Sequence, residues 1–286
     1  MILVTGGTGN IGRELLHELA GRDADTRMLV RDPARASHVP DSIARAIGDL
    51  DDPASLGEPF RGVDQLFLLT PGIGTAYASN AVAAAKKSGV RRVVLLSSDN
   101  VLGDPMPAMG QWHHEREEIL RGSGIPWTIL RPTGFMSNAL DWLPTLREVG
   151  YVLDPMGPGR YAPIDPADIA AVAATVITED GHDGREYVIT GPETLTVGEQ
   201  VRILEHAIGR KIDVRTVATA EEAVRARFPS GAPPALAAAI TEGFALMRAD
   251  TVGRRTDTVR QLLGREPHDF ADWCRLHAEA FASAGW

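Results

Sequence analysis

The sequence predicts an α/β protein built on a doubly wound parallel sheet, and two observations carry this prediction. Short apolar runs alternate with stretches of helical periodicity along the first half of the chain. Such alternation is typical of βαβ units, whose right-handed crossovers place helices on both faces of a parallel sheet. After about residue 133 the pattern loosens, and prolines and glycines gather in residues 153–166. We therefore expect a smaller mixed α/β lobe in the C-terminal half.

The expected strands are short apolar runs bounded by polar or turn-forming residues. They cover residues 1–5, 26–30, 43–49, 64–70, 91–98, 127–132 and 185–190. Ligands of such sheets bind outside the carboxyl ends of the strands. We expect residues 1–133 to form the sheet domain, with parts of 134–195 returning to it. Residues 134–286 are then expected to form mainly a substrate-binding lobe.

The expected helices follow from apolar spacing and from residues that favour helix ends. Ile11, Leu15, Leu16 and Leu19 recur at helical spacing, and further helices are expected over 78–88, ending at Gly89, and over 113–122. Two helix starts carry the capping-box pattern, in which a threonine precedes a glutamate by three residues. These pairs are Thr196 with Glu199 and Thr219 with Glu222, and a loop is expected over 229–234.

Composition narrows the class of protein. The chain has 286 residues, a formal net charge of −9 and no long basic run, which argues against nucleic acid or an anionic membrane as a partner. A single cysteine, Cys274, excludes an internal disulfide and a cysteine-rich metal site. Residue 1 already begins a strand-like run, so we expect no leader, and no run approaches the roughly 18 apolar residues of a membrane span. A reducing cytoplasm is the simplest compartment, with a monomer or a homodimer equally open.

The segment TGGTGNIG follows the first strand and opens a helix, as a dinucleotide site requires. Glycines let the backbone approach phosphate oxygens, and the helix start offers free N–H groups. The spacing is G-x-x-G-x-x-G at Gly6, Gly9 and Gly12, and it resembles the extended and atypical branches of the short-chain dehydrogenase/reductase superfamily. This resemblance implies a Rossmann-type, NAD(P)-binding domain. The expected contacts of the loop are Gly6, Gly7, Thr8, Gly9, Asn10 and Ile11.

The end of the second strand bears on the choice between NAD and NADP. The residue that contacts the ribose is expected about 20 residues beyond Gly12, where Arg31 and Asp32 lie side by side in the sequence. Because the two are adjacent, spacing alone does not decide between NAD and NADP. A guanidinium pairs well with a 2′-phosphate, and MLVRDPARA resembles NADP-using atypical members, so we favour NADP(H) held by Arg31. Gly48 and Asp49 match a GD pair whose aspartate lies by the adenine in those relatives, although Asp49 is almost as well explained as a turn residue. The adjacent Leu50 is also expected to contact the cofactor.

Most of the superfamily uses a Tyr-x-x-x-Lys pair for proton transfer. No tyrosine here has that lysine, because the residues four positions on are Ala81, Pro155, Asp165 and Gly191. The absence argues against ordinary hydroxyl dehydrogenation and against sugar-nucleotide epimerisation. Residues 111–138 instead resemble the NmrA-like atypical branch, in the pattern E-x-x-L-x-x-S-G-I-P-x-T-x-L-R-P that starts at Glu117.

His113 is the expected catalytic residue. Some members of that branch have lysine at this position, whereas bacterial quinone reductases and triphenylmethane-dye reductases resemble this chain in having histidine. The imidazole could donate a hydrogen bond to the nicotinamide ribose or act as an acid near neutral pH. Glu117 lies one helical turn on and either orients the imidazole or is solvated, and His114 is expected to face water. The segment HHERE is not a zinc motif, so we expect no metal.

Further site residues are expected from their positions after strands. Those at the ends of the fourth, fifth and sixth strands are Thr70, Pro71, Gly72, Ser97, Ser98, Pro132, Thr133, Gly134 and Phe135. Relatives hold the nicotinamide at the last of these ends. Four large side chains either wall an apolar pocket or belong to the core, and the sequence leaves both open. They are Phe135, Met136, Trp112 and Trp142.

Together, these expectations predict what the protein does. We expect an NADPH-dependent oxidoreductase that reduces a small conjugated acceptor of the quinone, dye, enone or iminium type. Such acceptors need little acid catalysis, because the product charge is delocalised, and the missing tyrosine–lysine pair is then explained. The alternative is a non-catalytic redox sensor, since the NmrA-like branch includes a regulator that binds nicotinamide dinucleotides. An isomerase or epimerase ranks last, because it would need another proton donor.

Overall fold

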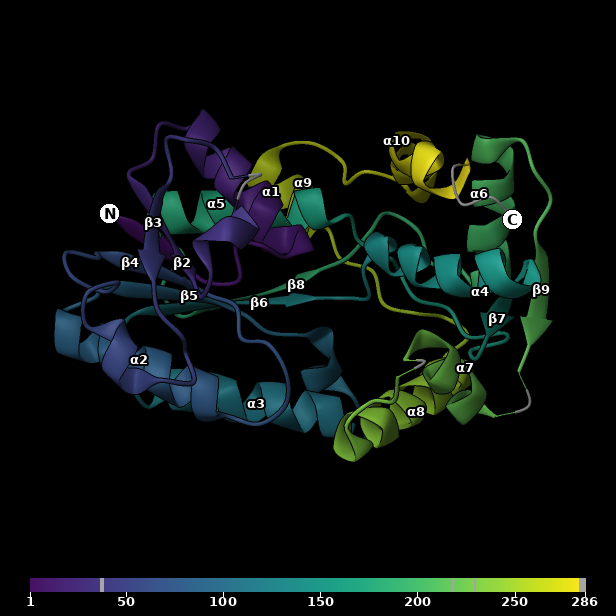
Figure 1. Ribbon diagram of the computed structural model, residues 1–286, viewed down its shortest axis with the longest axis horizontal. Coiled ribbons are helices and arrows are strands. Elements are labelled where there is room, and N and C mark those ends of the chain that lie inside the picture. The colour runs from purple at the N-terminus through teal and green to yellow at the C-terminus, as the bar shows by residue number, and fades with distance from the viewer. Residues whose placement is uncertain (37–38, 218, 229, 283–286) are drawn as a thin grey trace.

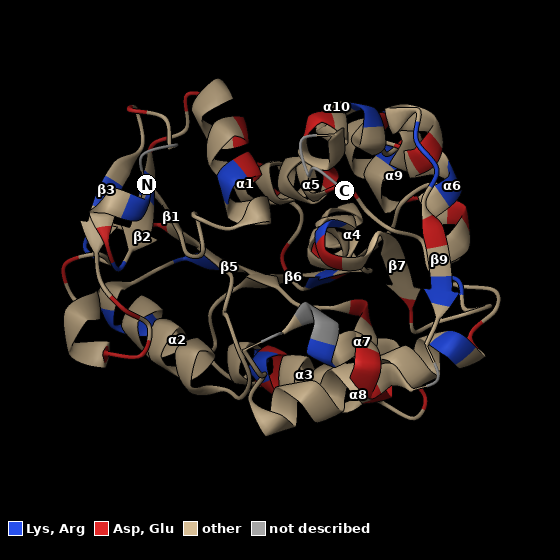
Figure 2. Cartoon of the chain, turned by 45° about the vertical axis from the view of Figure 1, so that its right-hand side comes forward, with Lys and Arg blue, Asp and Glu red and all other residues tan. Residues whose placement is uncertain are grey.

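The computed structural model describes residues 1–36, 39–217, 219–228 and 230–282. It has a larger lobe built on a central sheet, and a smaller lobe beyond the ends of the sheet strands (Figure 1). Acidic and basic side chains are interspersed over both lobes (Figure 2). Among the described helices, none is both long and apolar enough to cross a bilayer.

The central sheet is seven-stranded and parallel, in the order β3-β2-β1-β4-β5-β6-β8. The strand order reverses beside β1, as in a doubly wound sheet. All seven strands lie within the apolar runs predicted from the sequence, so the predicted fold class is confirmed. The strands are β1 (Ile2–Val4), β2 (Thr26–Val30), β3 (Ala44–Ile47), β4 (Gln65–Leu68), β5 (Arg92–Leu96), β6 (Trp127–Pro132) and β8 (Arg185–Ile189).

Helices cover both faces of the sheet (Figure 1). On one face, α1 (Asn10–Gly21), α5 (Pro166–Thr178) and α9 (Thr258–Leu263) bury apolar side chains against the strands. On the other face, α2 (Ala76–Ser88) and α3 (Ala108–Arg121) do the same. The helix α5 is almost wholly buried, because it is covered by the sheet, α1 and α9. Residues from the second half of the chain therefore complete the sheet lobe.

The end of α2 and the start of α3 can be compared with the helix boundaries predicted from the sequence. The helix α2 ends at Gly89 as predicted, with φ 75°, a left-handed conformation that glycine adopts without strain. The helix α3 begins at Ala108, not at 113, so the predicted start was wrong. The missed turn contains Gly110, a weak helix former, whose added Cβ would lie 2.3 Å from the carbonyl oxygen of Asn100. Close packing against the preceding segment holds this turn in the helix.

The smaller lobe has its own core. Its two-stranded parallel sheet pairs β7 (Tyr151–Asp154) with β9 (Asp213–Thr216), which the sequence did not predict. Its apolar centre includes the fully buried side chains of Phe270 and Trp273. The helices of this lobe are α4 (Leu143–Val149), α6 (Val197–Ile208), α7 (Ala220–Arg227), α8 (Pro234–Ala249) and α10 (Phe270–Ala282). The 3-10 turn η3 (Asp99–Leu102) joins β5 to α3, and the 3-10 turn η4 (Met136–Trp142) joins β6 to α4.

The two predicted capping boxes differ. At the start of α6 the box is complete: Glu199 N–H donates to the Thr196 hydroxyl at 3.1 Å, and Thr196 N–H donates to the Glu199 carboxylate at 2.9 Å. The helix α7 does begin after Thr219, but the Thr219 side chain makes no capping bond, so the second box was wrong. The Thr219 backbone carbonyl accepts the Glu222 N–H instead, at 3.3 Å.

Glu117 joins α3 to the sheet through a buried ionic network. Its carboxylate is fully buried and accepts hydrogen bonds from Ser97 Oγ at 2.6 Å, Arg131 Nη2 at 2.6 Å and Arg121 Nη2 at 2.9 Å. Arg131 also pairs with Glu186 on β8 at 2.6 Å. Both interpretations of Glu117 from the sequence were therefore wrong, because it neither faces water nor hydrogen-bonds to His113. Its partners on β5 and β6 could not be read from helical spacing.

Replacing Glu117 with glutamine is expected to lower the free energy of unfolding by about 3 kcal/mol, because it removes the fully buried counter-charge of Arg131 and leaves only the more exposed Glu186. Burial raises the pKa of Glu117, but hydrogen bonds from Arg131 and Ser97 outweigh it, so the pKa lies below the ordinary value. The stabilisation is therefore present above the ordinary glutamate pKa and is lost as the pH falls through the lowered one.

Urea unfolding at neutral and acidic pH measures this effect. The matched control is Glu118→Gln, since Glu118 is exposed and its ion pair with Arg121 lies at the surface. We expect that control to change the unfolding free energy by less than about 1 kcal/mol. An unchanged urea midpoint for Glu117→Gln at neutral pH would contradict the assignment.

Candidate active site

The glycine loop after β1 is shaped by close backbone contact. Gly6 has φ +70°, and a Cβ added at Gly12 would lie 2.2 Å from the Gly6 carbonyl oxygen. A Cβ at Gly7 would lie 2.8 Å from Leu16, so this glycine lets the loop pack on α1. Gly9 is the N-cap of α1, whose first turn has no acidic side chain. The loop therefore presents open backbone to a ligand, and Thr8 is half-buried beside it.

The start of α1 offers hydrogen-bond donors. The amides of Asn10 and Ile11 have no acceptor among the described residues, because the first helical bond runs from Arg13 N–H to the Gly9 carbonyl at 2.9 Å. Both residues also line the large cavity described below. Free amides and the positive end of the helix dipole suit a phosphate group.

At the end of β2, the structure distinguishes Asp32 from Arg31, the two residues that could contact the ribose or its 2′-phosphate. The Asp32 carboxylate accepts the Ala34 N–H at 3.0 Å and starts the 3-10 turn Pro33–Ala36, which was one expectation for it. Arg31 is exposed, and its guanidinium makes no hydrogen bond or ion pair with the described part of the chain. The guanidinium is therefore available to a ligand, whereas the carboxylate is engaged.

The end of β3 forms a tight turn. The Asp49 carboxylate accepts the Asp51 N–H at 3.0 Å, so the turn role that the sequence left open is observed. Asp49 remains half-exposed, and its contact with an adenine stays a prediction. Leu50 is buried, and its carbonyl accepts a hydrogen bond from Asn80 at 2.8 Å.

The ends of β4 and β5 contact the second half of α3 through Arg116 and Glu117. The Thr70 hydroxyl is buried and has no partner in the described structure. Pro71 and Gly72 are exposed and do not line the cavity, and the Gly72 carbonyl accepts a hydrogen bond from the buried Arg116 at 2.7 Å. Ser97 does line the cavity, but its hydroxyl is committed to Glu117. Of these residues, Thr70 is the one with an unused buried donor.

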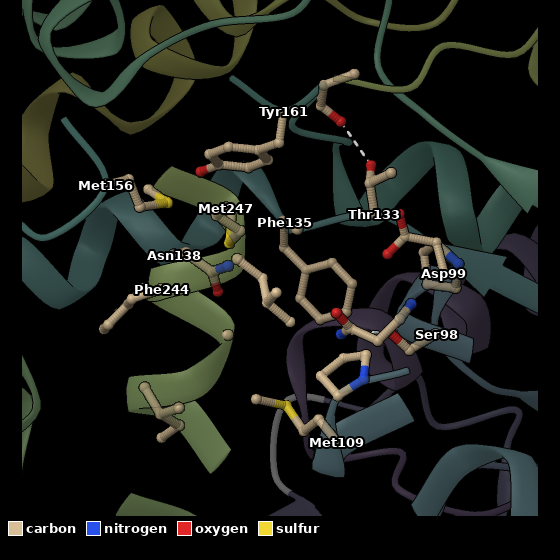
Figure 3. Close-up of a pocket in the computed structure, with 18 of the residues that line it drawn as sticks. Ser98, Asp99, Met109, Thr133, Phe135, Asn138, Met156, Tyr161, Phe244 and Met247 are labelled. Atoms are coloured by element: carbon tan, nitrogen blue, oxygen red, sulfur yellow. Dashed lines mark hydrogen bonds between the residues drawn. The ribbon is translucent and has the colours of Figure 1, made fainter. Parts of the chain in front are cut away.

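A cavity of about 730 Å³ extends from these strand ends to the smaller lobe. Pro132, Thr133 and Phe135 line it, as their positions after β6 predict. Gly134 allows the Tyr161 ring to lie against this segment, since its added Cβ would be 2.8 Å from Tyr161 Cε2. Much of the remaining wall is apolar and comes from segments that the sequence did not assign (Figure 3): Met109, Met156, Tyr161, Ile240, Phe244 and Met247.

Of the four large side chains left open by the sequence, two line the cavity and one belongs to the core. Phe135 and Trp142 line the cavity, whereas Met136 is 1% exposed and belongs to the core of the smaller lobe. Trp112 is half-buried and does not line the cavity. A further lining residue that the sequence analysis missed is Asp99. Its position directly after the predicted strand 91–98 was the signal that could have found it.

His113 lines the cavity with its Nδ1 atom buried and without a partner among the described residues. Burial, assisted by the charge of Arg116, lowers the pKa of His113 to about 4, against a smaller opposing effect of Glu117. The imidazole is therefore neutral at neutral pH, which disagrees with its expected role as a charged acid. A neutral ring still donates one hydrogen bond, so the expected contact with a ribose remains a prediction. His114 is exposed, as expected.

These features fit a nicotinamide dinucleotide. The glycine loop leaves room for a pyrophosphate. The buried Thr70 hydroxyl and His113 Nδ1 belong to residues that line the cavity, and neither has a hydrogen-bond partner among the described residues. Among the described residues, no three histidine, cysteine or acidic side chains are placed to hold a metal ion.

Comparison with known proteins decides the family. A family model described as NAD(P)H-binding matches residues 6–180. The chain belongs to this family. The match covers the glycines of the loop, the sheet strands β2 to β6 and the helix α5.

Individual relatives span the whole chain. A (4-alkanoyl-5-oxo-2,5-dihydrofuran-3-yl)methyl phosphate reductase from Streptomyces griseus is 38% identical over 286 residues, covering 99% of both chains. An NAD(P)H azoreductase from Xenophilus azovorans is 37% identical, covering 99% of this chain and 100% of its own. An NADPH-dependent quinone oxidoreductase from Escherichia coli, solved with NADPH, is 27% identical with a TM-score of 0.83, covering 96% and 98%. The resemblance to the NmrA-like atypical branch is thereby confirmed.

Replacing Gly12 with alanine is expected to weaken both the loop and nucleotide binding, because the new Cβ would overlap the Gly6 carbonyl. We expect a loss of about 1–3 kcal/mol in unfolding free energy and at least tenfold weaker NADPH binding. The matched control is Gly21→Ala at the other end of α1, where an added Cβ meets nothing within 4 Å. Thermal unfolding and nucleotide fluorescence measure the two effects. Equal behaviour of the two variants would refute the close-contact argument.

Proposed function

We propose that the protein is a reductase that passes hydride from NADPH to a small conjugated acceptor. The observation that carries the proposal is the cavity of about 730 Å³, which joins the start of α1 to an apolar wall in the smaller lobe. The family expectation of an NAD(P)H-dependent reductase is confirmed by relatives that are named as reductases. The specific preference for NADPH and the class of acceptor are the new parts of the proposal.

Each part of the cofactor has residues to hold it. The free amides of Asn10 and Ile11 would bind the pyrophosphate, and Arg31 would pair with the 2′-phosphate. Thr70 and His113 would donate hydrogen bonds at the nicotinamide end, where their buried polar atoms have no other partner. When bound, the reduced nicotinamide supplies the hydride, and the protein supplies orientation and a site that excludes water.

The acceptor would lie against the apolar wall. Flexible methionine side chains and aromatic rings suit flat molecules of variable outline. The chain's relatives include an azoreductase, a quinone oxidoreductase and an oxo-dihydrofuran phosphate reductase. Quinones and related conjugated carbonyl compounds are therefore the acceptors to try first, with azo dyes second.

Arg31→Ala is expected to weaken NADPH binding by about 10- to 100-fold and to leave NADH binding nearly unchanged. The reason is the loss of charge-assisted hydrogen bonds to a phosphate that NADH lacks, worth about 1.5–3 kcal/mol. The control is Arg185→Ala, an exposed arginine that begins the edge strand β8. Fluorescence titration of the reduced nucleotides measures both affinities. Tighter binding of NADH than of NADPH by the unaltered protein would overturn the assignment of Arg31.

His113→Ala is expected to lower kcat/KM with a quinone by about 10- to 100-fold, whereas His114→Ala changes it less than about twofold. His114 is the matched control because it is the adjacent histidine and faces water. Because the pKa of His113 is about 4, its ionisation should leave no inflection in activity between pH 5 and 8. The assay follows loss of NADPH absorbance. Tight NADPH binding without turnover on any acceptor would favour a redox sensor instead.

A further inference from the structure

Asp99 stands out in the cavity because its carboxyl group is unused. It lies just past β5, beside Ser98 and Thr133 in the wall away from Met247 (Figure 3). Among the described residues, its own backbone N–H is the one group that hydrogen-bonds to the carboxylate. A carboxyl group exposed to a substrate cavity and lacking a structural partner is available to the ligand.

The other charged groups of the cavity are mostly engaged. Asp250 accepts the N–H groups of Val252 and Gly253, at 3.0 and 2.9 Å. Arg160 donates to the Glu199 carboxylate at 2.6 Å. The titratable or charged side chains that share the cavity with Asp99 are His113 from α3, Asp141 from η4, Arg160 and Tyr161 after β7, and Asp250 and Arg254 after α8.

The pKa of Asp99 lies above that of an ordinary aspartate. Burial raises the pKa of Asp99 to about 6, and the nearby charge of Arg254 partly opposes this rise. A carboxylic acid with such a pKa exists in both forms near neutral pH, which suits a group that gives up and regains a proton. Arg254 is exposed and makes no hydrogen bond with the described residues, so its effect on Asp99 is electrostatic.

We propose that Asp99 is a catalytic residue that donates a proton to the oxygen of the acceptor, and that the preferred acceptors are neutral conjugated carbonyl compounds. This inference rests on the proposed reductase function. Hydride addition to a quinone or an enone leaves an oxyanion, which needs a proton, whereas hydride addition to a cationic dye gives a neutral product directly. Arg254 beside Asp99 also disfavours a cation at this position.

The acceptor is reduced by two electrons and takes up one proton from Asp99. The acceptor gains a hydride, with its two electrons, as the nicotinamide cofactor is oxidised. A new O–H bond forms on the acceptor as the O–H bond of Asp99 breaks. The Asp99 carboxylate then recovers a proton from water that enters the cavity. For each turnover, one acceptor, one reduced cofactor and one proton from solvent are consumed.

The first test compares Asp99→Asn with Asp213→Asn, an exposed aspartate on β9 that undergoes the same change of charge. At pH 6, kcat/KM with a benzoquinone is expected to fall about 100-fold in Asp99→Asn and less than twofold in the control. Reduction of a cationic triphenylmethane dye, which needs no proton, is expected to change less than threefold. A loss of dye reduction equal to the loss of quinone reduction would overturn the proposal, since Asp99 would then act in binding or folding.

The second test uses pH and does not depend on the dye. In the unaltered protein, kcat/KM with the quinone should fall above about pH 6 as Asp99 ionises, and Asp99→Asn should abolish this inflection. Arg254→Ala should move the inflection upward, because it removes the charge that favours the carboxylate. In the protein without nucleotide, infrared spectroscopy should show a protonated carboxyl band that disappears over the same pH range and is absent from Asp99→Asn.

The outcomes separate the two proposals. Turnover of quinone by the unaltered protein that Asp99→Asn leaves unchanged overturns the role of Asp99 alone. Binding of NADPH without turnover of any acceptor by the unaltered protein overturns the reductase function, and the inference falls with it. A carboxyl band in Asp99→Asn identical to that of the unaltered protein also contradicts the assignment.

Discussion

The wall of the active-site cavity depends on one buried carboxylate, that of Glu117. Its hydrogen bonds to Ser97 and Arg131 fix α3 against the ends of β5 and β6. The same helix carries His113 into the cavity, and its Arg116 holds the loop after β4 through the Gly72 carbonyl. A charge buried without water is costly unless it is fully paired, so this arrangement tolerates little displacement. The position of the strand ends relative to α3 is set by that requirement.

Around this fixed wall, the two lobes have different chemical characters. The sheet lobe contributes backbone amides, an unpartnered hydroxyl and a neutral imidazole, which are groups that bind a nucleotide by hydrogen bonds. The smaller lobe contributes methionine and aromatic side chains, which adapt to an apolar molecule. An added Cβ at Gly12 would lie 2.2 Å from the Gly6 carbonyl oxygen, so the glycine loop is closely packed, whereas the proposed acceptor wall consists largely of flexible side chains. Such a division suits one cofactor and several acceptors.

The sequence predicted the parts of the molecule that local patterns determine. The seven strands of the main sheet, the glycine loop, the end of α2 at Gly89 and the capping box at Thr196 all rest on residues within a few positions of one another. The rest depends on contacts between distant segments. The role of Glu117 requires Arg131, fourteen residues away on another element. The wall formed by α8 and the pairing of β7 with β9 join segments whose separation in the chain carries no periodic signal.

The return of β8 to the edge of the main sheet has a consequence for how the chain is made and how it diversifies. The strand pairs with β6 only after the chain has passed through α4 and β7 of the smaller lobe, and the Thr258 hydroxyl beyond it donates to the Val188 carbonyl at 2.6 Å. During synthesis, the nucleotide-binding sheet therefore stays incomplete until most of the chain has emerged. The smaller lobe is interleaved with the sheet rather than appended to it. New acceptor specificity is accordingly easier to reach by changing the segments between β6 and β8 and around α8 than by exchanging a terminal domain.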